Sequence, residues 1–356
     1  MKFRRVPGAE LSREHRNIWS ELQRNNRHLV SPYFCPEFTE AVASVRDDVM
    51  VTILEEGGKI VGFFPFQRGH FGTGRPVGSG LSDYQGVIAH EDTTFDVHDL
   101  LRASRLGLWS FDHLIANQAP FARYHRVKAV SPALDLSGGY AAYRKRLKEA
   151  GRSRIAQLER KARKLGRDVG PLRFEAHSLD RRVLSQLLAW KSEQCRRTGI
   201  PDFFALSWTV ELVERILATH EPHFGGRLSA LFAGDHLVAA HLGMRSTHAW
   251  HWWFPVYSHA FAQHSPGGLL LLHVAQEAAA QGAQILDLGK GDDPYKTSFA
   301  DLEIPLAEGC AVRASLAASL KFARETTEQL LRSPAARPLR PALRRFNQWA
   351  RRRSIA

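Results

Sequence analysis

Residues able to exchange protons or to stabilise negative charge gather in the second half of the chain. Asp287 ends an apolar run, and Tyr295 and Lys296 follow it within the segment DLGKGDDPYKTSF, residues 287–299. A carboxylate can accept a proton from a nucleophile, and a phenol can donate one to a leaving group, while an ammonium can stabilise an oxyanion or contact a phosphate. His241, at the end of an expected hairpin, is another candidate base. These four residues are therefore candidate catalytic groups.

Each of these residues also has a structural interpretation. The Asp287 carboxylate can brace the next turn, and Lys296 can be a surface lysine. Tyr295 can simply pack, and a single histidine on a strand, such as His241, is more often structural than catalytic. The sequence leaves both interpretations open for all four.

The segment before Asp287 has the pattern of an anion-binding loop. An aromatic strand, 250–257, leads through SPGG at 265–268 into an apolar helix that Gly282 closes, and a second strand follows at 285–288. Free backbone N–H groups and the helix dipole point at the same spot at a helix start, which suits a phosphorylated ligand. The residues expected to contact this ligand are Gln263, Pro266, Gly267 and Gly268.

Aromatic and polar residues elsewhere are candidates for contacting a second substrate. Trp252 and Tyr257 lie on the aromatic strand and can form a platform for a sugar or an acyl chain, although aromatic residues on a strand more often belong to the core. Asp83 and Tyr84 lie in the glycine-rich passage 69–86 of the first half.

The two halves of the chain repeat one order of elements. Each half contains, in this order, a helix with a tryptophan, a hairpin with a glycine turn, a second helix and a strand. The tryptophans are Trp19 and Trp190, the turn glycines are Gly57 and Gly234, and corresponding elements lie at a nearly constant separation. This pattern predicts two tandem copies of one α/β unit. Only the second copy has a glycine loop before its last helix, so only that copy is expected to hold the phosphorylated ligand.

The positive charge is concentrated in two segments. The chain carries a net charge of +13, and residues 144–167 contain 11 basic and 2 acidic residues, while 321–356 contain 10 and 2. The first segment predicts a basic helix over 143–166, either a solvated helix packed across the copies or a surface for phosphates and acidic polymers. The second predicts a basic tail that either lies on an anionic membrane or is disordered. Nucleic acid is not expected as a partner, because no known binding module is visible.

The remaining composition points to a cytoplasmic protein, with a peripheral place at the inner face of a membrane if the tail binds lipid. No secretory signal and no apolar run long enough to span a membrane are visible. The three cysteines are far apart and have no metal-ligand spacing, so we expect them to be reduced and structural, and we expect no metal site.

The order of hairpin, aromatic strand, Pro-Gly loop, helix, strand and Tyr-Lys turn resembles the GNAT fold of the N-acetyltransferases. More narrowly, Tyr257, Pro266-Gly267 and the segment 287–299 are similar to the FemAB-like, CelD/BcsL type of acetyltransferase associated with cellulose and exopolysaccharide production. The resemblance covers about residues 19–314. It implies an acyl-CoA donor, such as acetyl-CoA, held between splayed strands with its pyrophosphate at the start of the helix. The sequence departs from the usual signature because Pro266 removes one amide donor.

The resulting prediction is an α/β protein of two tandem GNAT-like domains, consisting of mixed sheets flanked by helices. The N-terminal domain spans 1–140 with a degenerate donor site, a basic linking helix spans 141–170, the acyl-CoA domain spans 171–314, and the basic tail spans 315–356. The predicted function is transfer of an acyl group from acyl-CoA to a hydroxyl or amine of a saccharide or cell-envelope precursor, with the acceptor between the domains. The alternatives are an aminoacyl-tRNA-dependent transferase of the FemAB kind and a non-catalytic scaffold of a polysaccharide synthase complex.

Overall fold

The structure is a computed structural model that describes residues 1–313. The predictions for the tail at 315–356 therefore lie outside the described residues. The described residues form two compact units: unit 1 comprises Met1–Leu22, Val42–Lys128 and residues 307–313, and unit 2 comprises Gln23–Ala41 and Ala129–Leu306. Each unit is therefore built from separate stretches of the chain.

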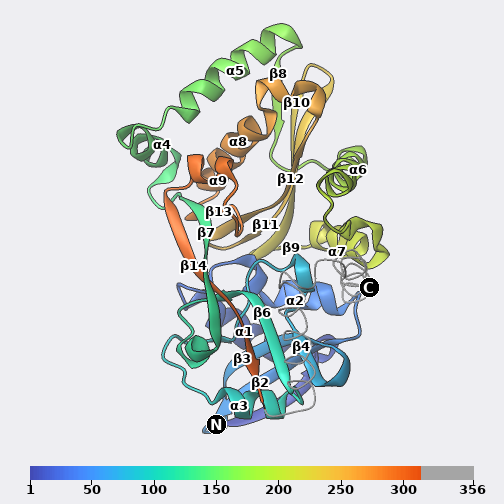
Figure 1. Ribbon diagram of the computed structural model, residues 1–356, viewed down its shortest axis with the longest axis vertical. Helices are drawn as coiled ribbons and strands as arrows, with labels where there is room; N and C mark the ends of the chain where they lie inside the picture. Colours follow the sequence, from blue (N-terminus) through green and yellow to red (C-terminus); the bar gives the residue numbers. More distant parts are fainter. Residues whose placement is uncertain (314–356) are drawn as a thin grey trace, which may run out of the picture. The chain divides into compact units, whose positions relative to one another are not determined.

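The first copy of the repeat begins the chain (Figure 1). Its elements are β1 (Lys2–Pro7), η1 (Gly8–Glu10), α1 (Arg13–Arg24), η2 (Pro32–Phe34), α2 (Pro36–Ala43), β2 (Val49–Glu56), β3 (Lys59–Arg68), η3 (His70–Gly72), β4 (Thr73–Arg75), η4 (Ser79–Leu81), β5 (Ile88–Ala89), α3 (Val97–Ala103), β6 (Leu108–Ile115) and η5 (Ala119–Tyr124). The strands follow the order β1-β2-β3-β4-β6, and β4 and β6 are parallel.

The second copy follows two connecting helices. The elements from here on are β7 (His125–Asp135), α4 (Gly139–Glu149), α5 (Arg154–Asp168), β8 (Leu172–Glu175), α6 (Arg181–Thr198), η6 (Phe203–Ala205), α7 (Ser207–Ala218), β9 (His220–Glu221), β10 (Phe224–Ala233), β11 (His236–Ser246), β12 (Ala249–Tyr257), η7 (His259–His264), α8 (Pro266–Ala280), β13 (Ile285–Asp287), α9 (Pro294–Phe299) and β14 (Leu302–Val312). The strands follow the order β7-β13-β12-β11-β10-β8, and β12 and β13 are parallel.

Matching details of the two hairpins confirm the predicted repeat. Gly57 and Gly234 both turn with a left-handed backbone, at φ 57° and 54°. The β2–β3 register shifts just after Leu54, and the β10–β11 register shifts just after Leu231, which is the position aligned with Leu54. A shift of register at the same place in both hairpins shows that the two hairpins share one backbone geometry. The predicted α/β fold class with two tandem copies is confirmed.

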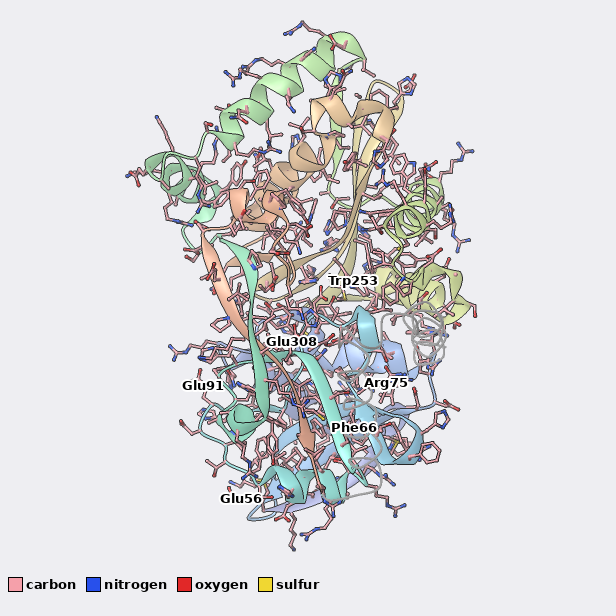
Figure 2. All side chains as sticks on the ribbon, in the orientation of Figure 1. Glu56, Phe66, Arg75, Glu91, Trp253 and Glu308 are labelled. Carbon is pink, nitrogen blue, oxygen red and sulfur yellow. The ribbon has the colours of Figure 1, made fainter. Side chains whose placement is uncertain are left out.

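The alternation of side chains along β3 explains how helices cover both faces of the first sheet. Phe63 stacks on Trp19 of α1, with ring centroids 4.8 Å apart. Phe64 and Phe66 belong instead to the cluster formed with Leu100 of α3; Phe66 is labelled in Figure 2. Successive strand residues point to opposite faces, so each apolar run buries both of its sides.

In unit 2, helices also cover both faces of the sheet. Figure 1 shows α8 on one face of β10–β12 and α6 with α7 on the other. Leu269, Leu270 and Val274 of α8 pack in one buried cluster with Trp250 and Trp252 of β12. This packing fixes the start of α8 near the end of β12.

The basic linking helix differs from its prediction. The sequence suggested one helix over 143–166, but the chain forms α4 and α5, separated by a turn in which Gly151 has φ 70°. A left-handed glycine ends a helix at little cost, so the Ala150–Ser153 segment breaks the helix. On α5, the apolar residues Ile155, Leu158 and Leu165 are buried. Among residues 1–313, no helix combines the length and the apolar character needed to cross a membrane.

Candidate functional site

The parallel strands β12 and β13 are paired over only three positions. Residues 249–251 of β12 pair with 285–287, and β12 then continues to Tyr257 without β13 beside it. The β11–β12 register changes between Leu242 and Met244, so β12 carries an extra residue at Trp252 and Trp253. A bulge bends and twists a strand, which explains why β12 leaves its neighbour here. The chain returns through η7 and enters α8 beyond the end of β12, where β12 is paired with β11 but not with β13.

The start of α8 offers a single free backbone donor. Ser265 has a left-handed backbone, at φ 52°, and its carbonyl accepts hydrogen bonds from the N–H groups of Gly268 and Leu269 at 3.0 and 3.2 Å. Pro266 has no N–H. Of the described residues, none accepts a hydrogen bond from the Gly267 N–H. The expected anion site therefore reduces to Gly267 and the positive end of the helix dipole.

Two side chains border this helix start. Lys161 of α5 donates a hydrogen bond to the Ser265 hydroxyl at 2.7 Å, which brings a cation from the basic segment to the loop. Tyr257 lies against Gly267, since a Cβ atom added to this glycine would be 3.3 Å from the Tyr257 ring. Gln263, predicted to contact the ligand, lies in η7 with its amide nitrogen 3.3 Å from His264.

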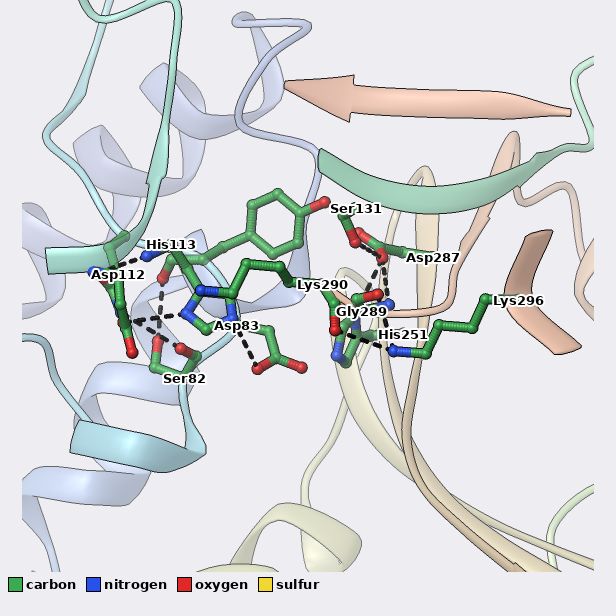
Figure 3. A network of polar contacts seen from close by, with 12 residues as sticks. Ser82, Asp83, Asp112, His113, Ser131, His251, Asp287, Gly289, Lys290 and Lys296 are labelled. Carbon is green, nitrogen blue, oxygen red and sulfur yellow. Dashed lines mark hydrogen bonds and ion pairs between the residues drawn. The ribbon is translucent and has the colours of Figure 1, made fainter. Parts of the chain in front are cut away.

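Asp287 is almost completely buried at the end of β13, with 3% of its surface exposed. Its carboxylate accepts hydrogen bonds from the Ser131 hydroxyl at 2.6 Å and from the Gly289 N–H at 2.7 Å (Figure 3). One oxygen also lies 3.8 Å from Nδ1 of His251. These contacts are those of a carboxylate that braces the turn after its strand, which is one of the two interpretations open from the sequence.

Lys296 closes the loop that follows Asp287. Its ammonium donates hydrogen bonds to the carbonyls of Gly289 and Lys290, at 3.1 and 2.9 Å (Figure 3). The ammonium also lies 3.6 Å from the Asp293 carboxylate. Only 7% of the residue is exposed, so Lys296 is not a surface lysine. Asp287 and Lys296 thus hold the same loop, because one binds the N–H of Gly289 and the other its carbonyl.

Tyr295 precedes Lys296 on α9 and keeps 36% of its surface exposed. Burial, followed by the nearby Asp293 carboxylate, raises the pKa of its phenol. The phenol is therefore protonated at neutral pH and able to donate a proton.

His241 is buried in the sheet, with 1% of its surface exposed. Its ring stacks on Trp252 at a centroid distance of 4.1 Å, and neither ring nitrogen has a hydrogen bond of ordinary geometry among the described residues. Burial, followed by the neighbouring His251, lowers the pKa of His241 to about 3. The ring is thus a neutral imidazole at physiological pH. Trp252 itself is 3% exposed and belongs to the core cluster around α8.

Lys191 of α6 is a candidate that the sequence did not suggest. Burial, with a further contribution from Lys296, lowers the pKa of its ammonium to about 8. The ammonium donates a hydrogen bond to Gln194 at 2.9 Å and lies 5.9 Å from the centre of the Phe254 ring. A lysine with a lowered pKa beside other charged groups is a common sign of a functional site. Its position in an amphipathic helix gave no local signal.

Asp83 and Tyr84 belong to unit 1, where they adjoin a second polar network. His113 has its Nδ1 3.0 Å from the Asp112 carboxylate and its Nε2 3.6 Å from that of Asp83 (Figure 3). Gln85 fixes this network, because its amide binds the Asp112 carboxylate at 2.6 Å and accepts from the Asp112 N–H at 2.9 Å. Tyr84 is buried, with 4% of its surface exposed. The sequence missed His113, although it follows Asp112, which occupies in the last strand of the first copy the place that Asp287 occupies in the second.

Comparison with known proteins assigns the fold around the α8 loop and Lys296 in unit 2. Residues 152–297 match a family model described as an acetyltransferase (GNAT) domain. These residues form a GNAT-type domain. A search of curated protein sequences finds no match. The GNAT match begins before α5 and ends within α9, so it includes both the α8 loop and Lys296.

Solved structures align with a larger part of the chain than the GNAT family model covers. FemX covers 87% of this chain and 96% of its own, with a TM-score of 0.59 and 9% identity. The C-terminal domain (DUF2156) of a protein assigned as a lysylphosphatidylglycerol synthetase from Agrobacterium fabrum covers 88% of this chain and 96% of its own, with a TM-score of 0.52 and 13% identity. At these identities the likeness concerns the fold alone.

Proposed function

We propose that the GNAT domain of this protein transfers an acyl group from acyl-CoA to a hydroxyl or an amine. The observation that carries this proposal is the start of α8, where β12 has left β13 and the Gly267 N–H has no acceptor among the described residues. A helix start with an unused N–H suits one phosphate of a pyrophosphate. Lys161, held at Ser265, adds a positive charge beside it.

The groups near the loop suit the two proton transfers of an acyl transfer. Tyr295 is proposed to protonate the departing thiolate, since its phenol keeps its proton at neutral pH. Lys191 and Asp287 are the candidate acceptors of the proton from the nucleophile. Lys191 has the advantage that a pKa of about 8 leaves part of it neutral near that pH, whereas Asp287 is already engaged by Ser131 and Gly289. Lys296 is proposed to keep the loop in place and to supply positive charge to an oxyanion.

The acceptor is proposed to be a saccharide or another cell-envelope precursor, in a process such as exopolysaccharide or cellulose production. The support is the similarity of the segment 287–299 to the CelD/BcsL type, together with the exposed ring of Tyr257 beside Gly267. Trp252 is buried, so Tyr257 is the stronger candidate for sugar stacking. Asp83, with the neighbouring His113, is proposed as a contact for acceptor hydroxyl or amino groups in unit 1.

Calorimetric titration with acetyl-CoA tests the donor site. We expect binding by the wild-type protein and binding weaker by at least about tenfold for Gly267→Glu, because the new carboxylate repels a phosphate at the helix start. Gly267→Ala keeps the N–H and should bind nearly as well as wild type. Ala280→Glu places the same charge at the other, exposed end of α8 and serves as the control. Absence of binding at high micromolar acetyl-CoA, or an unchanged affinity for Gly267→Glu, would refute acyl-CoA use.

A second candidate is an aminoacyl-tRNA-dependent transferase. The observation that favours it is the contact of the basic helix α5 with the donor loop through Lys161, since exposed Arg163, Lys164 and Arg167 continue the same cationic helix. It predicts RNA binding that weakens steeply with salt, measurable by filter binding. Failure of both acetyl-CoA and tRNA to bind would favour the non-catalytic scaffold.

A further inference from the structure

The tip between β3 and β4 presents an aromatic side chain to solvent in a strained backbone conformation. Phe71 has φ 55° and ψ 32°, in the left-handed region, and 77% of its surface is exposed. A bulky residue with a left-handed backbone is uncommon and costs free energy, and exposure of the ring adds no stability to compensate. The fold therefore holds a strained, solvent-facing phenyl ring without any visible benefit to unit 1.

Hydrogen bonds hold this tip in place. The Gly69 N–H donates to the Thr73 carbonyl at 2.8 Å, and the Thr73 hydroxyl donates to the His70 carbonyl at 2.8 Å. The Gly72 carbonyl accepts from the N–H of Gly107, at 2.8 Å, which joins the tip to the turn between α3 and β6. These hydrogen bonds thus fix the conformation of the turn that carries Phe71.

Three arginines surround the tip. Arg68 precedes it, Arg105 lies in the adjoining α3–β6 turn with its own left-handed backbone at φ 55°, and Arg5 binds the Ser104 carbonyl of that turn at 3.3 Å. Burial lowers the pKa of Arg5, and the charges of Arg105 and Arg68 lower it further. Within residues 1–313, no carboxylate forms an ion pair with any of the three.

The chain itself brings further positive charge to this corner of unit 1. The Arg313 N–H donates to the Gly107 carbonyl at 2.8 Å, and its guanidinium donates to the Leu106 carbonyl at 3.4 Å. The segment that starts immediately after Arg313 contains the 10 basic and 2 acidic residues of 321–356.

We propose that the β3–β4 tip is a docking surface for an anionic lipid bilayer, with the Phe71 ring inserted among the headgroups and Arg5, Arg68 and Arg105 facing them. An exposed aromatic ring suits the apolar region below the lipid headgroups, and cations without an ion-pair partner suit the negative charge of the headgroups. Insertion into the bilayer removes the Phe71 ring from water, whereas the fold leaves it exposed. This surface is independent of the proposed transferase reaction.

Vesicle flotation of the full-length protein tests this surface. We expect binding to vesicles of phosphatidylcholine mixed with phosphatidylglycerol, little binding to phosphatidylcholine alone, and a loss of binding with increasing salt. Phe71→Asn removes the ring and relieves the strain, because asparagine adopts a left-handed backbone readily, so the variant folds while its partition falls by about tenfold. Leu179→Asn is the matched control, because Leu179 is 83% exposed in unit 2 and should not matter.

A fluorescent label reports insertion directly. Cys35, Cys195 and Cys310 are all buried, so a thiol introduced by Phe71→Cys or by Leu179→Cys reacts selectively with an environment-sensitive dye. On anionic vesicles, we expect a blue shift at position 71 and none at 179. If the protein floats but Phe71→Asn floats equally well and position 71 shows no shift, another segment binds lipid and the proposal is wrong. Binding to single-stranded RNA without any binding to vesicles would also overturn it.

Discussion

Protonation of the buried His241 should make the protein sensitive to mild acid. Its pKa is about 3 in the folded protein, whereas an unfolded chain gives histidine its ordinary value of about 6.5. Between these values the unfolded chain binds a proton that the folded protein does not. Stability is therefore constant above the unfolded pKa and falls as the pH drops from about 6.5 toward 3.

The size of this loss follows from the two pKa values. Each pH unit well inside the window costs about 1.4 kcal/mol, so this one residue removes about 2 kcal/mol of unfolding free energy between pH 7 and pH 5. In His241→Leu this contribution is absent at every pH. The substitution loses the stacking on Trp252, but that loss does not depend on pH.

Urea unfolding followed by far-ultraviolet circular dichroism, at pH 7 and at pH 5, measures the effect. Relative to wild type, His241→Leu should gain about 2 kcal/mol on going from pH 7 to pH 5, with an unchanged denaturant slope. His98→Leu, at an exposed position, is the control, and its free energy of unfolding should change with pH as that of the wild type does. An equal change in unfolding free energy between pH 7 and pH 5 for wild type and His241→Leu would refute the argument, because His241 would then be protonated equally in the folded and unfolded states.

Two further substitutions test the environment of β11 and α6. Gly243→Ala should destabilise the protein by about 1–3 kcal/mol in urea unfolding, because the added Cβ would lie 2.5 Å from the His251 carbonyl oxygen and against the His241 ring. Gly166→Ala in α5, where a Cβ meets nothing within 4 Å, is the control and should be neutral or slightly stabilising, and equal effects of the two would contradict the steric argument. Lys191→Met should stabilise the protein at pH 7, with an advantage that shrinks by about 2 kcal/mol by pH 9.5, since folded Lys191 loses its proton near pH 8 and an unfolded lysine near 10.4. An advantage that does not change with pH would show that the Lys191 pKa is not lowered.

The hairpins and the repeat were readable from the sequence because their signals are local. Apolar runs on either side of Gly57 and Gly234 define both hairpins, and these glycines take the left-handed backbone that a tight turn requires. Pro266 and Gly282 likewise mark the start and the end of α8 within its sequence. Spacing alone then revealed that the same order of elements occurs twice.

The donor loop shows where local reasoning reached its limit. The pattern SPGG predicted a helix start rich in free N–H groups, and the helix does start there. The left-handed backbone of Ser265, however, lets its carbonyl capture the N–H of Gly268, so only Gly267 remains. The basic helix was similarly recognisable by its charge, yet its break at Gly151 depended on the backbone conformation of one glycine.

The sequence by itself determined the hairpins, the helix α8 and the tandem α/β fold, because hydrophobic periodicity and glycine turns act over a few residues. Only the tertiary structure decided how the charged groups are used. It turned Lys296 inward to the carbonyls of its own loop, enclosed His241 so that its imidazole stays neutral, and lowered the pKa of Lys191. Burial and electrostatic environment come from segments far apart in the chain, and no local pattern encodes them.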